Sequence, residues 1–297
     1  THLEKMNAIV GATTPAKVGI IFDWESRWML DASAGPSAFA KDYVGAVKSH
    51  YLPFWKRGVS VDLLNGDSNL RGYDVVIAPQ LYMLREGFAE RVEKFVARGG
   101  TFVATYLTGI ANETDLVFQG GLPGPLRTVL GIRSEEIDYL YPEERNEVSF
   151  VVNARYGLKG TYEVANVCDV IRAETAEILA TYQKDFYVGR PAVTVNYFGK
   201  GMAWYVAAAG ADDGLLDAFY ESVIDSRGLE KALPDCSLPS GVTAQVRQTR
   251  DEQFVFVMNF NNTPVEMEFD RPRTDMLTGD TVNGCKTLPA YGVLVLK

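Results

Sequence analysis

The stretch KVGIIFDWESRW, residues 17–28, determines how the first half of the chain is interpreted. Its first part, KVGIIFD (17–23), is a short apolar run with several β-branched residues, which is typical of a strand buried on both faces of a sheet. Two acids, two tryptophans and an arginine lie at the end of this strand. We therefore expect a sheet whose first strand ends in a polar and aromatic segment.

Strand and helix patterns alternate after this strand, up to residue 107. A helical stripe of aromatic residues at spacing four is followed by two strands, an amphipathic helix and a further strand. These elements are predicted at 37–58, 60–65, 73–81, 85–100 and 101–107. Alternation with short connections predicts parallel pairing through right-handed crossovers. We expect an open, doubly wound α/β sheet of the flavodoxin-like or class I glutamine-amidotransferase-like type.

In the second half of the chain the strand and helix patterns are less regular, and the spacing of the apolar residues then changes. A loop-rich stretch at 108–131 precedes strand signals around 147–167 and 177–210, and a helix is predicted at 214–229. The following residues, EKALPDCSLPSG, are rich in proline and serine and indicate a linker. Beyond them apolar and polar residues alternate with a period of two and no helix pattern occurs, which indicates a small all-β sandwich.

The chain is thus expected to consist of four segments. Leu3, Met6, Ile9 and Val10 have helical spacing, so the first residues are predicted to be the tail of an amphipathic helix that enters from an upstream domain. The predicted boundaries are 1–16 for this connector helix, 17–229 for the flavodoxin-like domain, 230–241 for the linker and 242–297 for the C-terminal β domain.

Composition and charge exclude several classes of partner. The formal net charge is -9 and is spread along the 297 residues. An acidic surface repels phosphate backbones, so we expect no nucleic-acid partner. The sequence has no basic amphipathic segment and no apolar run near the roughly 20 residues that span a bilayer, so we expect no membrane association.

The three cysteines, Cys168, Cys236 and Cys285, are odd in number and widely spaced. This pattern favours neither a disulfide framework nor a zinc site, because no two cysteines have C-x-x-C spacing. We interpret them as reduced thiols of a cytoplasmic protein. We expect no metal and no cofactor.

The sequence lacks the residues for two kinds of chemistry that are known for doubly wound sheets. Gly121-x-x-Gly124 and Gly199-x-Gly201 are the nearest approach to a phosphate loop, but neither follows the first strand or has the required spacing. An amidotransferase-like site needs a cysteine nucleophile and a histidine base. No cysteine follows TFVATYL (101–107), and we expect His50 on the solvent side of its helix.

The acids Asp23 and Glu25 admit two interpretations from the residues alone. If they alternate at the end of a strand, their side chains point the same way and could approach the spacing of about 5–9 Å that glycoside hydrolysis requires. They are more simply explained as polar groups that cap the next helix, or that bridge to a partner together with the nearby Arg27.

Several long motifs resemble one known family. KVGIIFDWESRW is followed by Gly35-Pro36-Ser37 and then by YLPFWKRGVSVDLLNGDSNLRGYDVVIAPQLYML, which strongly resembles the middle domain of family 42 glycoside hydrolases, the bacterial β-galactosidases. The resemblance continues in GGTFVATYLTGIANETDLVFQGGLPGPLRTVLGI and in GRPAVTVNYFGKGMAWYVAAAG. The tail that ends in LPAYGVLVLK is similar to the C-terminal domain of that family. The resemblance spans residues 17–297.

This resemblance implies an assembly role. In that family a catalytic (β/α)8 barrel precedes a flavodoxin-like trimerisation domain and a small β domain, and both catalytic glutamates belong to the barrel. The resemblance therefore implies that this chain is the non-catalytic oligomerisation and C-terminal portion of a β-galactosidase. Its expected partners are two further copies in a homotrimer and the catalytic barrel, which lies outside this chain.

Within the resemblance, the segment after the first strand has no catalytic role. We expect Asp23, Trp24, Glu25, Arg27 and Trp28 to pack against the barrel or a neighbouring subunit and to border the galactoside cleft, since tryptophan and arginine are enriched at interface cores. One alternative is a loop packed only within its own domain. Another is a self-sufficient protein, either a carbohydrate-binding module or a cleft hydrolase that uses the two acids.

Overall fold

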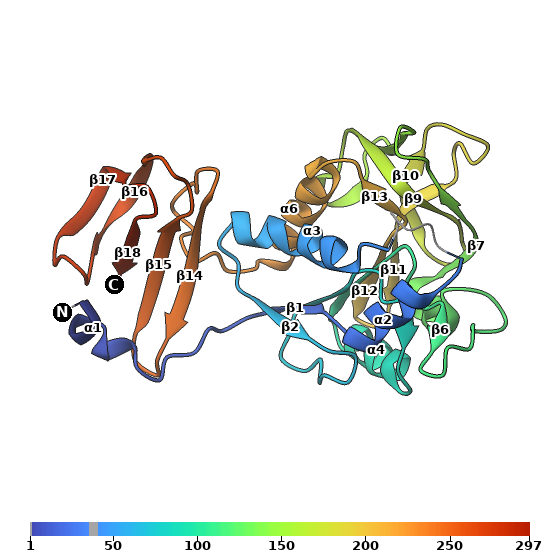
Figure 1. The fold of residues 1–297 in the computed structure, drawn as a ribbon, viewed down its shortest axis with the longest axis horizontal. Coiled ribbons are helices and arrows are strands. Elements are labelled where there is room, and N and C mark those ends of the chain that lie inside the picture. Colours follow the sequence, from blue (N-terminus) through green and yellow to red (C-terminus); the bar gives the residue numbers. More distant parts are fainter. Residues whose placement is uncertain (1, 36–40) are drawn as a thin grey trace. The chain divides into compact units, whose positions relative to one another are not determined.

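A computed structural model of the protein describes residues 2–35 and 41–297 (Figure 1). The chain forms two compact units, which we call the α/β unit and the β unit. The α/β unit consists of Val18–Tyr51 and Asp62–Arg227, and the β unit consists of Thr1–Lys17, Leu52–Val61 and Gly228–Lys297.

One half of the main sheet in the α/β unit is parallel. Strand β3 pairs in parallel with β1 and β5, β12 pairs in parallel with β5, and β2 lies beyond β1. These strands are β1 (Val18–Ile21), β2 (Val61–Leu64), β3 (Val75–Ala78), β5 (Thr101–Thr105) and β12 (Gly201–Val206). Every residue of β1, β3 and β5 is buried, which agrees with their largely apolar sequences. The predicted parallel pairing is confirmed for β1, β3 and β5.

The other half of the same sheet is antiparallel. It continues from β12 in the order β11, β10, β8, β9 and β13, and β7 pairs with the far end of β9. The strands are β7 (Ile132–Tyr139), β8 (Asn146–Phe150), β9 (Thr161–Ala173), β10 (Glu177–Tyr182), β11 (Pro191–Phe198) and β13 (Ala208–Gly210). The sequence indicated most of these strands, but it did not show that they extend the parallel sheet into one mixed α/β sheet. A separate ribbon joins β4 (Met83–Leu84) to β6 (Ala111–Asn112).

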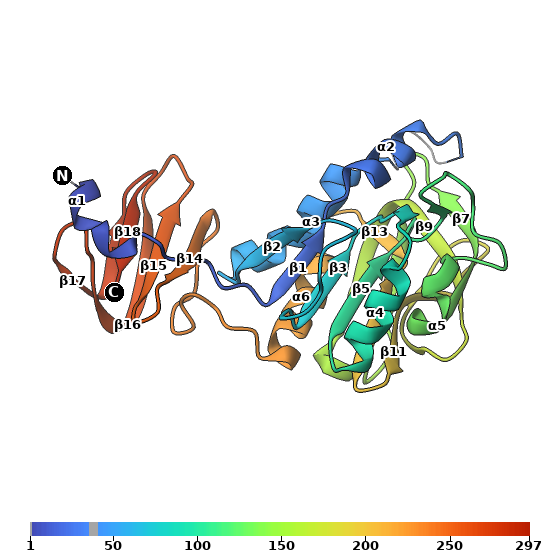
Figure 2. The ribbon, with the colours of Figure 1, turned by 90° about the horizontal axis from the view of Figure 1, so that it is seen from below.

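Helices cover both faces of the parallel strands. Helix α4 lies on one face, and α3 and α6 lie on the other (Figures 1 and 2). The helices of this unit are α2 (Trp24–Ala32), α3 (Tyr43–Lys56, whose last residues belong to the β unit), α4 (Phe88–Ala97), α5 (Arg127–Leu130) and α6 (Gly214–Arg227). Short 3-10 turns occur at Gly124–Leu126 and Arg155–Gly157. Helix α4 buries Phe88, Val92 and Val96, as its periodicity predicts.

Helix α3 is shorter than the predicted helix 37–58. Residues 37–40 lie outside the described residues, and the helix runs from Tyr43 to Lys56 with Pro53 inside it. The expectation that His50 faces solvent is wrong. Its side chain is buried and its Nδ1 contacts the hydroxyl of Tyr220 on α6, because the amphipathic face of α3 packs inward at this turn. Burial lowers the pKa of His50 to about 3, so the imidazole is neutral.

The β unit contains the predicted small all-β fold. A three-stranded antiparallel sheet has the order β14, β15, β18, and β16 pairs with β17 in a hairpin. The strands are β14 (Val242–Gln248), β15 (Gln253–Asn259), β16 (Val265–Thr274), β17 (Thr281–Leu288) and β18 (Val293–Leu296). Their alternating inward side chains, among them Val257, Met267 and Phe269, form one buried core.

The connector helix predicted over 1–16 is wrong in extent. Among the described residues of this range, only α1 (His2–Lys5) and a 3-10 turn at Asn7–Ile9 are helical. Gly11 then adopts a left-handed conformation with φ of 81°, and Thr13 exchanges backbone hydrogen bonds with Gln248 at the end of β14. Pairing with a strand of the β unit therefore replaces the helix that the apolar spacing predicted.

Candidate functional site at the start of helix α2

The segment after β1 begins a helix and does not extend the strand. Asp23 is the N-cap of α2, and its Oδ1 accepts hydrogen bonds from the backbone N–H groups of Glu25 and Ser26, both at 3.0 Å. The assumption that Asp23 and Glu25 alternate along a strand end is therefore wrong, and the alternative of helix-capping groups is confirmed for Asp23. An Asp followed by an acid in the first turn is the local signal that predicts such a helix start.

Asp23 is buried, and the guanidinium of Arg85 balances its negative charge. Only 2% of the residue is exposed, and its Oδ2 accepts hydrogen bonds from Arg85 Nε at 3.0 Å and from the backbone of Gly66 at 3.1 Å. Burial acts to raise the pKa of Asp23, but the hydrogen bonds from Arg85, Ser26 and Gly66 outweigh it and hold the pKa below its usual value. A general acid needs the opposite shift, so Asp23 is unsuited to that role at neutral pH.

Arg85 also binds the neighbouring acids. Its Nη2 lies 2.8 Å from Oε2 of Glu25, and its Nε lies 3.4 Å from Oδ2 of Asp67. Asp23 and Glu25 therefore share one guanidinium. Since Asp23 is held inside this cluster and Glu25 is drawn toward the same cation, the two acids do not form the open pair that glycoside cleavage requires.

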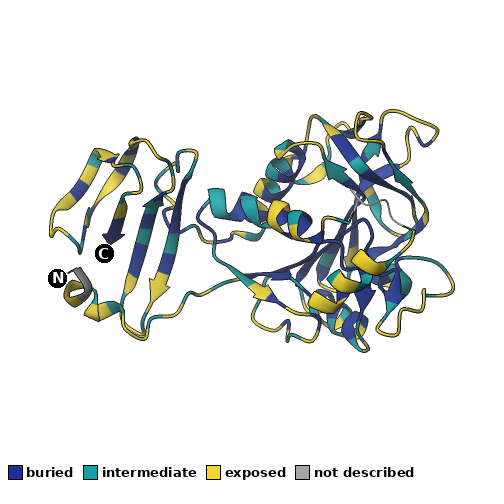
Figure 3. Ribbon diagram, viewed as in Figure 1, coloured by how far each residue is buried: buried dark blue, intermediate teal, exposed yellow. Residues whose placement is uncertain are grey.

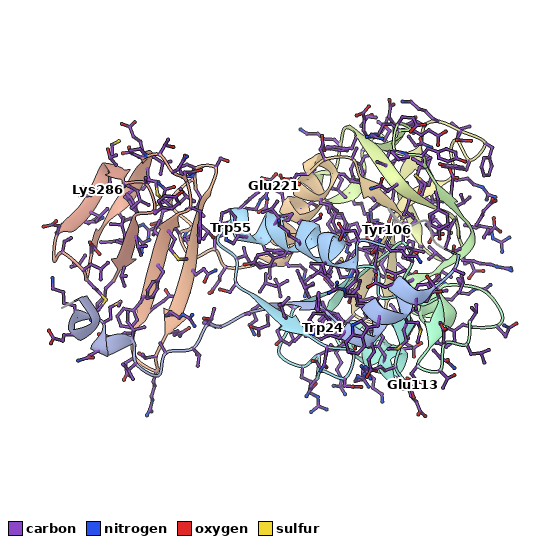
Figure 4. All side chains as sticks on the ribbon, viewed as in Figure 1. Trp24, Trp55, Tyr106, Glu113, Glu221 and Lys286 are labelled. Atoms are coloured by element: carbon purple, nitrogen blue, oxygen red, sulfur yellow. The ribbon has the colours of Figure 1, made fainter. Side chains whose placement is uncertain are left out.

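The outer face of α2 carries two exposed indoles. The ribbon of α2 carries exposed stretches, drawn in yellow in Figure 3. Trp24 is 54% exposed and Trp28, one turn later, is 60% exposed. Their ring centroids are 6.3 Å apart, and the Arg27 guanidinium lies 5.3 Å from the Trp24 ring centroid. Trp24 also meets Phe22 edge to face, and Figure 4 labels it on α2. We call Trp24, Arg27 and Trp28 the indole face.

The inner side of α2 fixes this face in place. Ser26 and Leu30 are fully buried, and the Ser26 hydroxyl accepts a hydrogen bond from the backbone N–H of Met83 at 3.1 Å. Asp23 anchors the first turn through Arg85. The helix therefore presents two large rings to solvent from a fixed support.

A second buried carboxylate has a different environment. Asp169 on β9 is 1% exposed and accepts hydrogen bonds from the hydroxyl groups of Ser134 and Tyr205, with no cation bound to it among the described residues. Burial raises its pKa to about 6, although both hydroxyl groups favour the ionised form. The sequence did not single out this residue.

The remaining candidate positions have structural roles. Gly199 has a φ of 62° and forms the turn between antiparallel β11 and β12, which is not a phosphate loop. After β5, Tyr106, which is labelled in Figure 4, is buried. It lines a small cavity of about 150 Å³ together with His50 and Gln80. Among residues 2–35 and 41–297, no three His, Cys, Asp or Glu side chains cluster closely enough to hold a metal.

Two further observations concern the state of the cysteines and the length of the helices. Cys168, Cys236 and Cys285 are free thiols, and burial raises the pKa of the Cys168 thiol to about 12. No helix in the described part of the chain is long and apolar enough to cross a membrane.

Comparison with known proteins gives matches over nearly the whole chain. A family model described as the β-galactosidase trimerisation domain matches residues 16–230, and one described as the β-galactosidase C-terminal domain matches residues 241–297. The β-galactosidase Pbg of Clostridium perfringens is 43% identical over 296 residues, which cover 99% of this chain and 43% of that protein. The chain thus spans less than half the length of the curated relatives it matches.

Solved structures agree with this result. The crystal structure of a β-galactosidase from Bacillus circulans sp. alkalophilus superposes with a TM-score of 0.93 at 42% identity, over 99% of this chain and 43% of that one. A GH42 β-galactosidase from G. stearothermophilus gives a TM-score of 0.91 at 36% identity, over 99% of this chain and 42% of that one.

Proposed function

Since the chain belongs to the family 42 β-galactosidases, of which it carries the trimerisation and C-terminal domains, we propose that it is the non-catalytic assembly portion of an enzyme that hydrolyses terminal β-D-galactosides. The observation that carries this proposal is the match of both family models, which together account for residues 16–230 and 241–297. The capping role of Asp23 supports it, because the most acidic candidate site in the sequence is occupied by a structural ion pair.

In this proposal the α/β unit is a flavodoxin-like or amidotransferase-like domain that assembles into a homotrimer. The strand order β2-β1-β3-β5-β12 supports the fold assignment, because flavodoxin-like sheets have the order 2-1-3-4-5. The description of the matching family supports the oligomeric role. The proposed organisation is a connector at 1–16, a trimerisation domain at 17–229, a linker at 230–241 and a C-terminal domain at 242–297.

The indole face is the proposed contact with a neighbouring subunit or with the catalytic barrel, at the border of the galactoside cleft. Asp23 and Glu25 support this contact from below, and Trp24, Arg27 and Trp28 are the contact groups. Tryptophan and arginine dominate the binding free energy of many interfaces, and each indole can bury about 150–250 Å². Half-exposed rings on a fixed helix favour this role over packing within the domain alone.

The proposal includes a cytoplasmic location and no nucleic-acid or membrane partner. The three free thiols support the cytoplasmic location, because secreted proteins usually oxidise theirs. The net charge of -9 disfavours polyanionic partners. The alternative of a free-standing cleft hydrolase is disfavoured because Asp23 is bound by Arg85 and buried.

Two measurements on the purified 297-residue chain test the proposal. Native mass spectrometry is expected to detect three copies per particle, and a chromogenic β-galactoside is expected to remain intact. Hydrolysis by the pure chain would overturn the non-catalytic assignment. A chain that stays monomeric at micromolar concentration would overturn the assembly role.

A further inference from the structure

A large hollow lies at the edge of the parallel sheet opposite the start of α2. Its volume is about 580 Å³. Its lining comes from residues 69–74 before β3, from α4 between Arg91 and Phe95, from residues 98–100 before β5, and from the end of α6. Figure 2 shows β3, β5 and α4 side by side. The charged residues that line the hollow are Arg71, Asp74, Arg91, Lys94, Arg98 and Arg227. Five cationic side chains thus surround one space in a chain whose net charge is -9.

These cations lack carboxylate partners. Within residues 2–35 and 41–297, Arg71, Lys94 and Arg98 form no ion pair. The Nη2 groups of Arg91 and Arg227 donate to the backbone carbonyls of Gly66 and Gly99.

Two donors at the hollow remain unsatisfied. The Nε–H groups of Arg91 and Arg227 are buried and have no hydrogen-bond partner among the described residues. A buried donor without an acceptor destabilises the structure that contains it, and more so when the group is charged. Both donors belong to guanidinium groups of residues that line the hollow, so the hydrogen bonding of these two groups is incomplete within the described residues.

Helix electrostatics explains only part of this arrangement. Basic residues near a helix C-terminus offset the negative end of its dipole, which accounts for Lys94 and Arg98 at the end of α4. It does not account for Arg71, which lies in the turn before β3, or for the unpaired Nε of Arg91 in the middle of α4. The extra positive charge therefore points to a ligand.

We propose that this hollow binds a phosphorylated small molecule. Guanidinium groups bind phosphate oxygens through paired N–H donors, and Arg71, Arg91 and Arg98 surround one space from two separate segments. Tyr73, Phe95 and Leu70 provide an apolar wall for the remainder of the ligand. The volume falls within the range of about 300–1,000 Å³ that is usual for small-molecule sites. This site would add a ligand-responsive function to the chain and does not depend on the proposed trimer.

Titration of the 297-residue chain with inorganic phosphate and pyrophosphate tests the proposal. Isothermal titration calorimetry at constant ionic strength is expected to detect saturable binding, tighter for pyrophosphate because it carries more charge. The exposed pair Arg71→Gln and Arg98→Gln is expected to weaken pyrophosphate binding by at least about tenfold, since each charge-assisted hydrogen bond contributes more than 1 kcal/mol.

Matched variants separate a built site from general charge. Lys159→Gln removes one exposed positive charge from the same unit away from the hollow, and it is expected to change the affinity by less than about twofold. Arg98→Lys keeps the charge but loses the planar pair of donors, and it is expected to give an intermediate affinity. Circular dichroism checks that each variant is folded. No saturable binding of either anion at millimolar concentration, or an equal loss in Lys159→Gln, would overturn the proposal.

Discussion

The two edges of the parallel sheet use charge in opposite ways. At the carboxyl end of β1, three acids surround Arg85, and the buried member of the cluster, Asp23, caps a helix. At the amino ends of β3 and β5, five cations surround a hollow that has a single acid, Asp74, in its lining. The first edge satisfies its charges internally and exposes aromatic rings, whereas the second leaves donors unsatisfied. The difference supports the two proposals, a macromolecular contact at the first edge and an anion site at the second.

Removal of Asp23 should cause the largest loss of stability among the variants of these two edges. Asp23→Ala leaves Arg85 without its buried partner and removes the N-cap of α2, so we expect a loss of about 3–5 kcal/mol in the free energy of unfolding. Urea denaturation measures the loss. The control Asp31→Ala removes an exposed acid that lies 3.6 Å from Arg27, and it should cost less than about 1 kcal/mol. Equal losses would mean that the cluster at Arg85 is not structural.

The ion pair between Asp23 and Arg85 also predicts how the stability of the protein depends on pH. The pKa of Asp23 is lowered in the folded state, so its stabilising contribution is complete above the pKa of the unfolded chain, about 3.9. The contribution is lost as the pH falls below that value toward the folded pKa. Wild type should therefore lose stability more steeply than Asp23→Ala below about pH 4. Parallel stability curves for the two proteins would contradict this prediction.

Asp169 is a contrast to Asp23, because it is a buried acid with no cation bound to it among the described residues. Its pKa is raised to about 6 in the folded state, so the folded protein keeps a proton that the unfolded chain releases near pH 4. Stability should consequently fall as the pH rises from about 4 to about 6, by on the order of 2–3 kcal/mol. Urea denaturation across this pH range measures the slope, and Asp169→Asn should remove it. An unchanged slope in the variant would assign the effect to another group.

The indole face should affect association more than folding. The double variant Trp24→Ala and Trp28→Ala is expected to raise the dissociation constant of the oligomer by roughly 30-fold or more, because buried indoles at interfaces contribute about 2 kcal/mol or more. The unfolding free energy of the isolated chain should change little, since both rings are more than half exposed. Analytical ultracentrifugation measures association. Phe186→Ala, which truncates another exposed ring of the same unit, serves as the control.

The sequence predicted elements better than it predicted the contacts between them. The apolar runs at Val75–Ala78 and Thr101–Thr105 indicated buried strands, and the structure contains both. Strand β7, IRSEEIDY, was missed because six of its eight residues are partly or fully exposed and no apolar run marks it. Helix α2 was missed because only two residues separate it from the preceding strand, although Asp23 carried the cap signal.

The two candidate sites differ in how much of them was visible in the sequence. Trp24, Arg27 and Trp28 lie within one helical turn and a half, so the group could be recognised as a cluster before any fold was known. Arg85, which decides the chemistry of Asp23, lies 62 residues away from it. The cations of the hollow come from three distant segments, and only the folded sheet brings Arg71, Arg98 and Arg227 together.

The smallest effect is expected from Glu25, and it tests which partner of Arg85 matters. The carboxylate of Glu25 lies 2.8 Å from Arg85 but is 55% exposed, so solvent screens the pair. Glu25→Gln should cost less than about 1 kcal/mol in urea denaturation and should leave the sedimentation of the oligomer unchanged. Stability would then depend on the buried Asp23 alone, with Glu25 as a dispensable rim charge. A loss as large as that of Asp23→Ala would instead make the three acids around Arg85 one cooperative unit, and the distinction between buried support and exposed face at this edge would no longer hold.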